Sequence, residues 1–477
     1  MKKIPQEGLS KESLFAEMKE MSKEDLDWRN GRNFAYVYYP GEEISNIVKE
    51  AYQMFFSENA LNPSAFPSLR NMENDIISMS ADLLGGNKKV VGSLTTGGTE
   101  SILMAVKTAR EWGKKNKNLE GPAQIILPAT AHPAFFKAAH YFGVEIIVIP
   151  VEDDFRVDPK KIEKAISSNT VLVVGSAPSY PQGVIDPIEA IGQIAKKNEL
   201  LFHVDSCVGG FILPFLKQLN YKIPSFDFSV EGVTSISADI HKYGYAAKGA
   251  SVILYKNSDL RKHQFYTYTK WTGGIYASPT MTGTRPGGPI AAAYAVLKFV
   301  GINGYHRLAK ICMETSQKLQ NAIREIPELN ILSTPEATLF AITSDVLDIY
   351  EVGDEMGILG WQIDRQQMPP SLHFSINPAH EKVIDQCIED LKIAVGKAKK
   401  MSLHKVGKNL QLQAVKTVQR ILPNHLFEKF QQFAAKHSDV GGQRSAAMYG
   451  MIGELQGKGD LDEMIKEFLD KMMKNEA

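Results

Sequence analysis

The chain has few cysteines and no excess of charge of either sign. Its three cysteines, Cys207, Cys312 and Cys387, are too few and too scattered for a disulfide framework or a zinc site. Lys plus Arg and Asp plus Glu both number 54, so the overall charge gives no reason to expect a nucleic-acid partner. No apolar run reaches the ~18 residues of a membrane helix, and residues 1–23 lack a signal-peptide core. These absences predict a cytoplasmic protein without a metal or a transmembrane anchor.

Short apolar segments alternate with amphipathic ones between Lys89 and Tyr255. The former are expected to be strands, and the latter have the spacing of helices. In chain order the segments are Val90–Val91, Thr99–Trp112, Gln124–Leu127, Pro133–Tyr141, Glu145–Val151, Pro159–Ile166, Val171–Val174, Ile185–Lys197, Leu200–Val204 and Ser251–Tyr255. This alternation predicts an α/β fold with a mostly parallel, doubly wound sheet, whose active residues lie at the carboxyl ends of the strands.

A second region with a different pattern begins near Ala291. Two helical segments, Ala291–Phe299 and Gly304–Ile326, precede strand-like runs at Ile331–Ser333, Leu339–Ile342 and Ser371–Ile376. Beyond Met401 the pattern is helical and ends in an amphipathic segment, Leu461–Met473. We therefore expect an N-terminal arm over 1–58, a large domain over 59–300, a smaller α+β domain over 301–401 and a helical extension over 402–477.

A His-Lys pair follows a strand-like segment within the run Ser237–Gly249, which reads Ser-Ala-Asp-Ile-His-Lys-Tyr-Gly-Tyr-Ala-Ala-Lys-Gly. Many enzymes that use pyridoxal 5'-phosphate (PLP) hold it by a lysine in this setting, here Lys242, beside a phosphate-binding histidine, here His241. Because the neutral amine is the nucleophile, surroundings that lower the pKa of Lys242 are expected. Taken alone, the pair also fits an ordinary surface lysine.

A glycine turn opens the helix predicted from Thr99. The run Thr95-Thr96-Gly97-Gly98-Thr99-Glu100-Ser101 follows a short strand, so free N–H groups and the helix dipole favour an anion there. A glycine turn capped by threonine or serine is the simpler alternative.

Two further residues fit a PLP site. His132 follows the strand Ile125–Leu127, where an imidazole can stack on a pyridine ring, and a capping or core histidine is the alternative. Asp205 ends an apolar strand, and a buried carboxylate needs a cation such as a protonated pyridine nitrogen. An aspartate that caps the next turn is the alternative. The order Gly98, His132, Asp205, Lys242 favours a PLP enzyme.

Lys248 follows Lys242 across small residues that let the turn fold close to a ligand. It either binds a substrate phosphate or lowers the pKa of its neighbour by like-charge repulsion. A solvated loop lysine is the third possibility.

The run Ser237–Gly249 closely resembles the cofactor segment of sphingosine-1-phosphate lyases. The similarity covers about Gly31 to Lys400. Further segments that look like those of the family are Thr96–Ile102, Gln182–Pro187, His203–Phe211, Gly273–Pro279, Thr284–Gly288 and Pro369–Phe374. The wider group of PLP-dependent decarboxylases shares the glycine turn, the aspartate and the His-Lys pair, whereas the continuation to Lys248 and the run Gly273–Pro279 favour the lyases.

The resemblance implies a PLP-dependent transferase of fold type I, assembled as a homodimer with active sites at the subunit interface. It implies that Lys242 forms the Schiff base with PLP, that Asp205 binds the pyridine nitrogen and that His132 stacks on the ring. The residues implied for the cofactor phosphate are Gly98, Thr99 and His241. Those that match positions near the substrate head group are Tyr38, Asn59, Tyr180 and Lys248.

The chain departs from the family in two places. Asn62 and Ser64 stand where the lyases usually have a histidine and an aspartate. An amide is neither an acid nor a base, so proton transfer at Asn62 is excluded and its part in substrate binding is open. The run Ala447–Met451, with Tyr449, resembles a family element near the active site but follows a long insert, roughly 403–444.

The implied reaction is retro-aldol cleavage of the C2–C3 bond of a phosphorylated sphingoid base, which gives a long-chain aldehyde and phosphoethanolamine. The base for the C3 hydroxyl proton is Lys242, Lys248, Tyr180 or Tyr449, and the sequence does not choose among them. A PLP-dependent amino-acid decarboxylase and a catalytically silent PLP-binding dimer are the alternatives. The family's animal members carry a membrane anchor that is not seen in this sequence, which implies a soluble bacterial form, with membrane-surface contact at most transient.

Overall fold

The computed structural model describes residues 3–406, 446 and 461–473. Their contacts divide the chain into two compact units. The larger comprises Phe34–Ile342 and His373–Ile384, and the smaller comprises Met1–Asn33, Thr343–Leu372 and Asp385–Ala477. The domain boundaries expected from the sequence stay a prediction.

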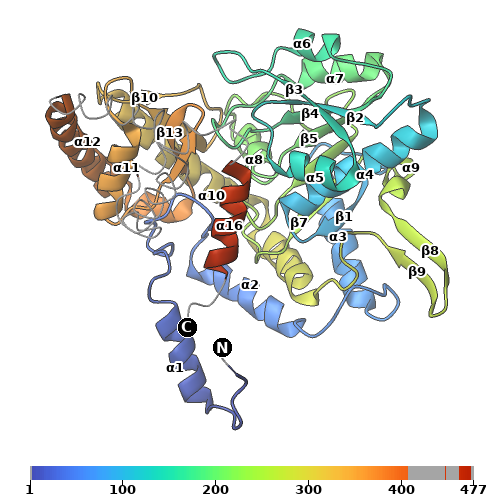
Figure 1. Cartoon of the computed structure of the whole chain (residues 1–477). Coiled ribbons are helices and arrows are strands. Elements are labelled where there is room, and N and C mark those ends of the chain that lie inside the picture. Colours follow the sequence, from blue (N-terminus) through green and yellow to red (C-terminus); the bar gives the residue numbers. More distant parts are fainter. Residues whose placement is uncertain (1–2, 407–445, 447–460, 474–477) are drawn as a thin grey trace, which may run out of the picture. The chain divides into compact units, whose positions relative to one another are not determined.

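The larger unit is built on a seven-stranded sheet of order β1-β7-β6-β5-β4-β2-β3 (Figure 1). Its strands are β1 (Val91–Thr95), β2 (Gln124–Pro128), β3 (Glu145–Ile149), β4 (Thr170–Ser176), β5 (Leu201–Asp205), β6 (Ser235–Ala238) and β7 (Ser251–Tyr255). The pairs from β3 through β2, β4 and β5 to β6 are parallel, whereas β7 is antiparallel to both β6 and β1. The predicted mostly parallel sheet is confirmed.

Apolar side chains are buried on both faces of this sheet. Along β2, Ile126 joins a core cluster with Ile188 of α7 (Ile188–Lys197), and its neighbour Ile125 joins a second cluster with Ile102 of α4 (Gly98–Asn116). Successive strand residues point to opposite faces, so helices cover both of them, as a doubly wound sheet requires. The helices that follow the strands are α4 (Gly98–Asn116), α5 (Ala134–Phe142), α6 (Pro159–Lys164), α7 (Ile188–Lys197), α8 (Leu213–Gln218) and α9 (Ser258–Arg261).

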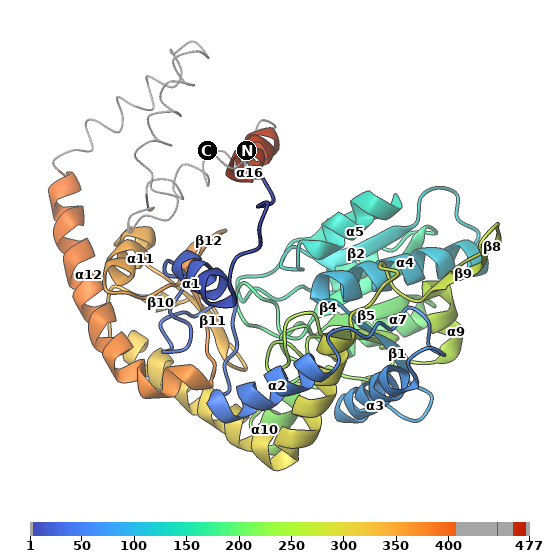
Figure 2. The same cartoon turned by 90° about the horizontal axis from the view of Figure 1, so that it is seen from below.

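A long helix, α10 (Gly287–Arg324), runs beside α2 (Glu42–Met54), and both can be followed in Figure 2. Gly301, with φ of 57°, interrupts α10 between the two helical segments expected from the sequence. The segment before β1 forms α3 (Pro67–Leu83).

The remaining strands form two small sheets. One has the order β10-β11-β13-β12, and the other is the hairpin β8-β9. Their strands are β8 (Tyr266–Trp271), β9 (Gly274–Ser278), β10 (Asn330–Ile331), β11 (Leu339–Thr343), β12 (Asp364–Gln367) and β13 (Pro370–Ser375). The helices of the smaller unit include α1 (Lys11–Met21), α11 (Ile349–Ile358), α16 (Leu461–Met472) and most of α12 (Ile384–Val406). Across the described ranges, none of the helices combines the length and apolarity needed to span a bilayer.

Candidate active site around Lys242

Lys242 lies in the connection between the antiparallel strands β6 and β7. Its backbone N–H donates to the carbonyl of Asp239 at 3.3 Å, and its Nζ forms an ion pair with Oδ2 of the same residue at 2.9 Å. The Asp239 side chain is only 2% exposed. Nε2 of His241 lies 3.6 Å from the same carboxylate oxygen, and its Nδ1 lies 2.8 Å from the carbonyl of Ala250. One buried carboxylate therefore organises both members of the His-Lys pair.

The charges in this connection set the ionisation of Lys242. Burial is the largest single influence and lowers the pKa of the amine, but the Asp239 carboxylate together with Cys207 and Tyr38 outweighs it, and the pKa lies above that of an ordinary lysine. Burial likewise raises the pKa of Asp239, whereas Lys242 and His241 bring it below its usual value. The lowered pKa expected for Lys242 is therefore wrong, because a carboxylate that the motif places three residues earlier holds the amine protonated.

The glycine turn faces this pair. A Cβ on Gly98 would lie 2.8 Å from Sγ of Cys207 and 2.9 Å from each carboxylate oxygen of Asp239. A Cβ on Gly97 would lie 3.6 Å from Cε1 of His241. Thr99 is exposed in the first turn of α4. The start of α4 thus packs against the Lys242 connection so closely that Gly98 has no room for a side chain.

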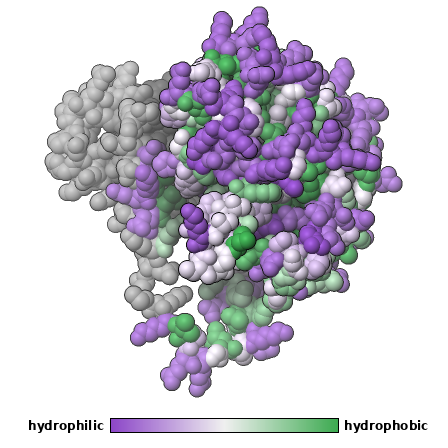
Figure 3. Space-filling view, turned by 90° about the vertical axis from the view of Figure 1, so that its right-hand side faces the viewer, coloured by the Kyte–Doolittle hydropathy of each residue, from purple (hydrophilic) through white to green (hydrophobic). Residues whose placement is uncertain are grey.

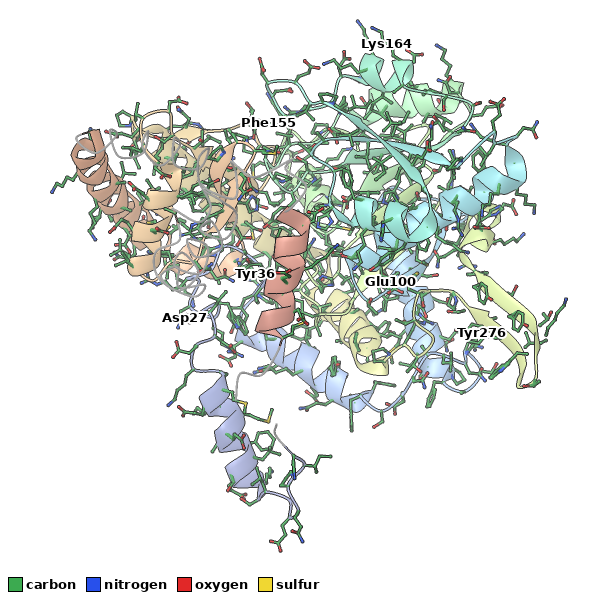
Figure 4. The ribbon with its side chains drawn as sticks, in the orientation of Figure 1. Asp27, Tyr36, Glu100, Phe155, Lys164 and Tyr276 are labelled. Atoms are coloured by element: carbon green, nitrogen blue, oxygen red, sulfur yellow. The ribbon has the colours of Figure 1, made fainter. Side chains whose placement is uncertain are left out.

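Glu100, labelled in Figure 4, fastens the glycine turn. Its Oε2 accepts hydrogen bonds from the N–H and the hydroxyl of Thr96, both at 2.7 Å, and its Oε1 accepts one from the N–H of Met281 at 2.8 Å. The residue is 7% exposed. A buried carboxylate with three donors is well satisfied, so Glu100 links the turn to the segment after β9.

Asp205 is the last residue of β5, at its carboxyl end. Its Oδ1 accepts hydrogen bonds from the N–H of Cys207 at 3.1 Å and from the hydroxyl of Ser237 at 3.3 Å. The same hydroxyl lies 3.1 Å from Nε2 of His203. Burial lowers the pKa of His203 to about 4, so this histidine is neutral near pH 7. Asp205 is 7% exposed. The two groups that donate hydrogen bonds to it are neutral, and both donate to its Oδ1.

His132 takes the capping geometry. Its Nδ1 accepts a hydrogen bond from the N–H of Ala134, the first residue of α5, at 3.1 Å, and the residue is exposed. This contact fits the capping alternative, and the stacking role stays a prediction.

Lys248 lies at the other end of the connection, beside Tyr38. Its Nζ donates to the carbonyl of Tyr36 at 2.7 Å and lies 5.7 Å from the ring centroid of Tyr38. The Tyr38 hydroxyl is 3.0 Å from that of Ser375, and its ring packs edge-on against Tyr243 at 4.7 Å. Burial of the amine and the charge of Lys242 lower the pKa of Lys248 to about 8, while Asp239 acts in the opposite direction. Of the two lysines on this connection, Lys248 is thus the one with the lowered pKa.

Tyr180 packs against a buried histidine. The ring centroids of Tyr180 and His373 are 4.2 Å apart, and Nδ1 of His373 lies 3.3 Å from the carbonyl of Pro181. Gly183, with φ of +71°, packs against the carbonyl of Leu339, which a Cβ would approach to 2.0 Å. The loop that carries Tyr180 is therefore packed against His373 at Tyr180 and against the backbone of Leu339 at Gly183.

Asn59 and Asn62 lie in a separate turn. The Asn59 side-chain oxygen accepts from the N–H of Leu61 at 2.8 Å, and that of Asn62 from the N–H of Ser64 at 2.9 Å. Arg285 anchors the turn through the carbonyl of Ala60 at 3.2 Å. Within the described residues, no hydrogen bond or ion pair joins these asparagines to the Lys242 connection. Tyr449 lies outside the described residues.

The sequence did not single out Asp239, Glu100, His373 or Arg285. All four lie inside segments that resemble the family. For Asp239 the available signal was its spacing of three residues from Lys242 in a predicted turn, which allows an ion pair.

The residues present fit PLP. A tight glycine turn at a helix N-terminus suits a phosphate, Lys242 supplies an amine, and a carboxylate ends β5. Oδ1 of Asp239 is buried without a hydrogen-bond partner, so the site has polar capacity that its own side chains do not use. Among the residues with a described placement, no cluster of His, Cys, Asp or Glu could hold a metal ion.

Comparison with known proteins agrees with this geometry. Residues 1–343 match the family described as the pyridoxal-dependent decarboxylase conserved domain. Sphingosine-1-phosphate lyases of Oryza sativa and Arabidopsis thaliana are 38% and 42% identical to the chain, over 98% of it and over 81% and 80% of their own lengths. The chain belongs to the sphingosine-1-phosphate lyase family. It is therefore a PLP-dependent lyase, and the predicted cofactor is confirmed.

A solved member of the family has the same fold. The structure of the Burkholderia pseudomallei sphingosine-1-phosphate lyase superposes with a TM-score of 0.81 at 40% identity, covering 87% of this chain and 96% of that one. The predicted PLP-enzyme fold with a smaller second sheet is confirmed.

Proposed function

We propose that the chain cleaves the C2–C3 bond of phosphorylated sphingoid bases and releases a long-chain aldehyde and phosphoethanolamine. The names of its relatives support this substrate class. The observation that carries the proposal is the pair Lys242 and Lys248 on one short connection, where only Lys248 has a pKa lowered to about 8. A retro-aldol cleavage needs one amine to hold the cofactor and a second group to take a hydroxyl proton.

The proposed cofactor roles are those that the resemblance to the family implies. When bound, PLP supplies an electron sink for the pair released by bond cleavage. Lys242 would hold it covalently, Asp205 would keep the pyridine nitrogen charged, and His132 would lie against the ring. Gly98, Thr99 and His241 would bind the phosphate.

Lys248 is our choice for the group that takes the C3 hydroxyl proton, because a group with a pKa near the working pH is an efficient base. Lys242 is protonated beside Asp239, which argues against it for this step. Tyr38, Asn59 and Tyr180 bind the head group, with Asn62 beside Asn59. Tyr449 is a further candidate for the group that takes the C3 hydroxyl proton, and its position in the sequence supports this role.

We also propose a homodimer with active sites at the interface. The hairpin β8-β9, where Figure 4 labels Tyr276, exposes Tyr266 (57%), Trp271 (55%) and Ile275 (79%). Figure 3 views the side from which the hairpin projects and shows apolar side chains among hydrophilic ones. A lone two-stranded hairpin is marginally stable in water, and exposed apolar patches mark interfaces. Ile275→Glu should increase the monomer fraction by sedimentation, whereas Val148→Glu on the edge strand β3 should not.

A cytoplasmic location with transient contact to membrane surfaces completes the proposal. Cys207, Cys312 and Cys387 are free thiols, which fits a reducing compartment. The lipid nature of the proposed substrate is the reason to expect the surface contact.

The decisive experiment measures fatty-aldehyde release from sphingosine-1-phosphate by the purified PLP-loaded chain. We expect aldehyde from the wild type, none from Lys242→Ala and a large loss in Lys248→Ala. Lys262→Ala, which changes an exposed lysine, is the matched control. Full turnover in Lys242→Ala, or in Lys248→Ala, would remove that lysine from the scheme.

The same preparation separates the alternatives. Carbon dioxide release from amino acids without aldehyde release would identify a decarboxylase. A cofactor absorbance that never changes on adding substrate would identify a silent PLP-binding protein.

A further inference from the structure

A strained turn lies directly against Lys248. Tyr36 has a φ of 61°, a left-handed conformation that is uncommon for a bulky residue. The N–H of Val37 donates to the carbonyl of Ala35 at 2.7 Å, so the three residues form a γ-turn with positive φ at its centre, a rare and strained arrangement. Strain of this kind persists where the surrounding structure holds it, and it gathers at functional sites.

The turn aims one backbone carbonyl at one amine. The carbonyl of Tyr36 accepts from Nζ of Lys248 at 2.7 Å, whereas the next acceptor, the carbonyl of His241, is 3.4 Å away. Tyr36, which Figure 4 labels, is 61% exposed by its accessible surface. The ring therefore contributes little to the core, and the contact with Lys248 is made by the backbone.

The lysine side of this contact is constrained as well. Tyr245, three residues before Lys248, also has a left-handed φ, 60°, and its N–H donates to the carbonyl of Lys242 at 2.9 Å. The hydroxyl of Tyr38, two residues after the strained position, is 3.0 Å from that of Ser375. Left-handed backbone therefore occurs both in the segment that accepts the hydrogen bond, at Tyr36, and in the connection that carries Lys248, at Tyr245.

We propose that Tyr36, through its left-handed backbone and not through its ring, is a positioning residue that fixes the amine of Lys248 for proton transfer. The inference rests on the proposed function for the meaning of that transfer. The contact itself does not depend on any substrate.

The groups that face this amine explain why the position matters. Lys242, Asp239 and His241 lie on the same connection, and Tyr38 packs from the segment that carries Tyr36. Lys242 disfavours a second positive charge, and Asp239 favours it. If the carbonyl of Tyr36 moves away, the amine is free to turn toward solvent, where a lysine recovers its ordinary pKa.

The test is a series of substitutions at position 36, ranked by tolerance of left-handed backbone. Glycine and asparagine tolerate it, alanine less, and a β-branched valine least. Tyr36→Asn and Tyr36→Val both remove the ring at similar size, so they are the matched pair. The readout is the pH dependence of acetylation of Lys248 by acetic anhydride, followed by peptide mass spectrometry, in the full chain without substrate.

We expect a labelling midpoint near pH 8 in the wild type, Tyr36→Gly and Tyr36→Asn, in line with the pKa of about 8 for Lys248. In Tyr36→Val the midpoint should rise by more than about one pH unit, which lowers the neutral fraction at pH 8 more than fivefold. The pH–rate profile of aldehyde release should move in parallel. Tyr36→Ala should lie between, and it keeps the ranking measurable if Tyr36→Val does not fold.

Equal midpoints in Tyr36→Asn and Tyr36→Val would overturn the inference, and so would a shift that follows loss of the ring. Absence of aldehyde from the wild type, with the ranked midpoints intact, would instead overturn the proposed function and leave the positioning contact standing.

Discussion

Removing the charge of Asp239 should make Lys242 a more reactive amine. The ion pair of 2.9 Å joins a carboxylate that is 2% exposed to a lysine that is 24% exposed. Opposite unit charges about 4 Å apart interact by about 4 kcal/mol at an effective dielectric constant of 20. The asparagine oxygen in Asp239→Asn can still accept from the amine, and the lysine is partly solvated, so we take about half of this value, ~2 kcal/mol. Since ~1.4 kcal/mol is tenfold, the neutral fraction of Lys242 should rise about 30-fold at a given pH.

Competitive acetylation of the cofactor-free protein, read by peptide mass spectrometry, measures this fraction. Asp259→Asn is the matched control, because Asp259 pairs with Lys262 at the same spacing of three residues and at 3.1 Å, but on the surface, with side chains 87% and 68% exposed. Exposed pairs contribute little, so Lys262 should label as in the wild type. An equal response of the two lysines, or no gain at Lys242, would refute the view that Asp239 sets the ionisation of Lys242.

Two further outcomes follow from the site, and a third from Asp186, a buried residue whose Oδ2 accepts a hydrogen bond from the N–H of Ser176 at 2.8 Å. Gly98→Ala should weaken PLP binding at least about tenfold and destabilise the fold by about 1–3 kcal/mol, because its Cβ would lie 2.8–2.9 Å from buried atoms. A fluorescence titration measures the first effect and a thermal scan the second. Gly121→Ala is the control and should show neither effect, because the nearest atom to its Cβ would be 3.4 Å away. Glu100→Gln keeps one acceptor oxygen of two, so a thermal scan should detect a loss of about 1–3 kcal/mol; an unchanged transition would mean that its three donors find other partners. Burial raises the pKa of Asp186 to about 7 from 3.8, so the folded state holds an extra proton between these values and stability falls as pH rises through them. Asp186→Asn should therefore gain stability relative to the wild type between pH 5 and 8, and a parallel course of the two would contradict the raised pKa.

Much of the fold was predictable because strands that are buried on both faces of a sheet appear in the sequence as short, continuous apolar runs. Apolar runs such as Val171–Val174 and Leu200–Val204 are too short for typical helices and fit strands of a covered sheet, and they form β4 and β5. The gap between the helical segments near Gly301 also marked a true interruption of α10. The direction of β7 was not predictable, because an apolar run such as Ser251–Tyr255 carries no information on whether its neighbours run with it or against it.

Candidate site residues could be predicted from the sequence where the chemistry of the cofactor requires a particular residue type, such as a lysine for the amine and an aspartate for the carboxylate. The order Gly98, His132, Asp205, Lys242 selected Lys242 and Asp205 as candidates, and their roles stay predictions. The ionisation of Lys242 was not predictable, because Asp239 could equally have capped the turn, and only the distance of 2.9 Å decides. The strained turn at Tyr36 was hidden for another reason: tyrosine is a poor choice for a left-handed backbone, so the sequence argued against what the structure has.

The two lysines share a connection that is tied at both ends to neighbouring antiparallel strands, β6 and β7. Within residues 239–250, the ion pair of Asp239 with Lys242 and the hydrogen bond from the N–H of Tyr245 to the carbonyl of Lys242 fix the positions of both lysines. A change of substrate preference within this architecture is therefore expected to come from the segments that face Lys242 and Lys248, while the connection that carries these two lysines stays unchanged. For protein engineering, this makes the side chain of Tyr38 the first place to build diversity, whereas the connection and the left-handed backbone at Tyr36 are the parts to keep constant.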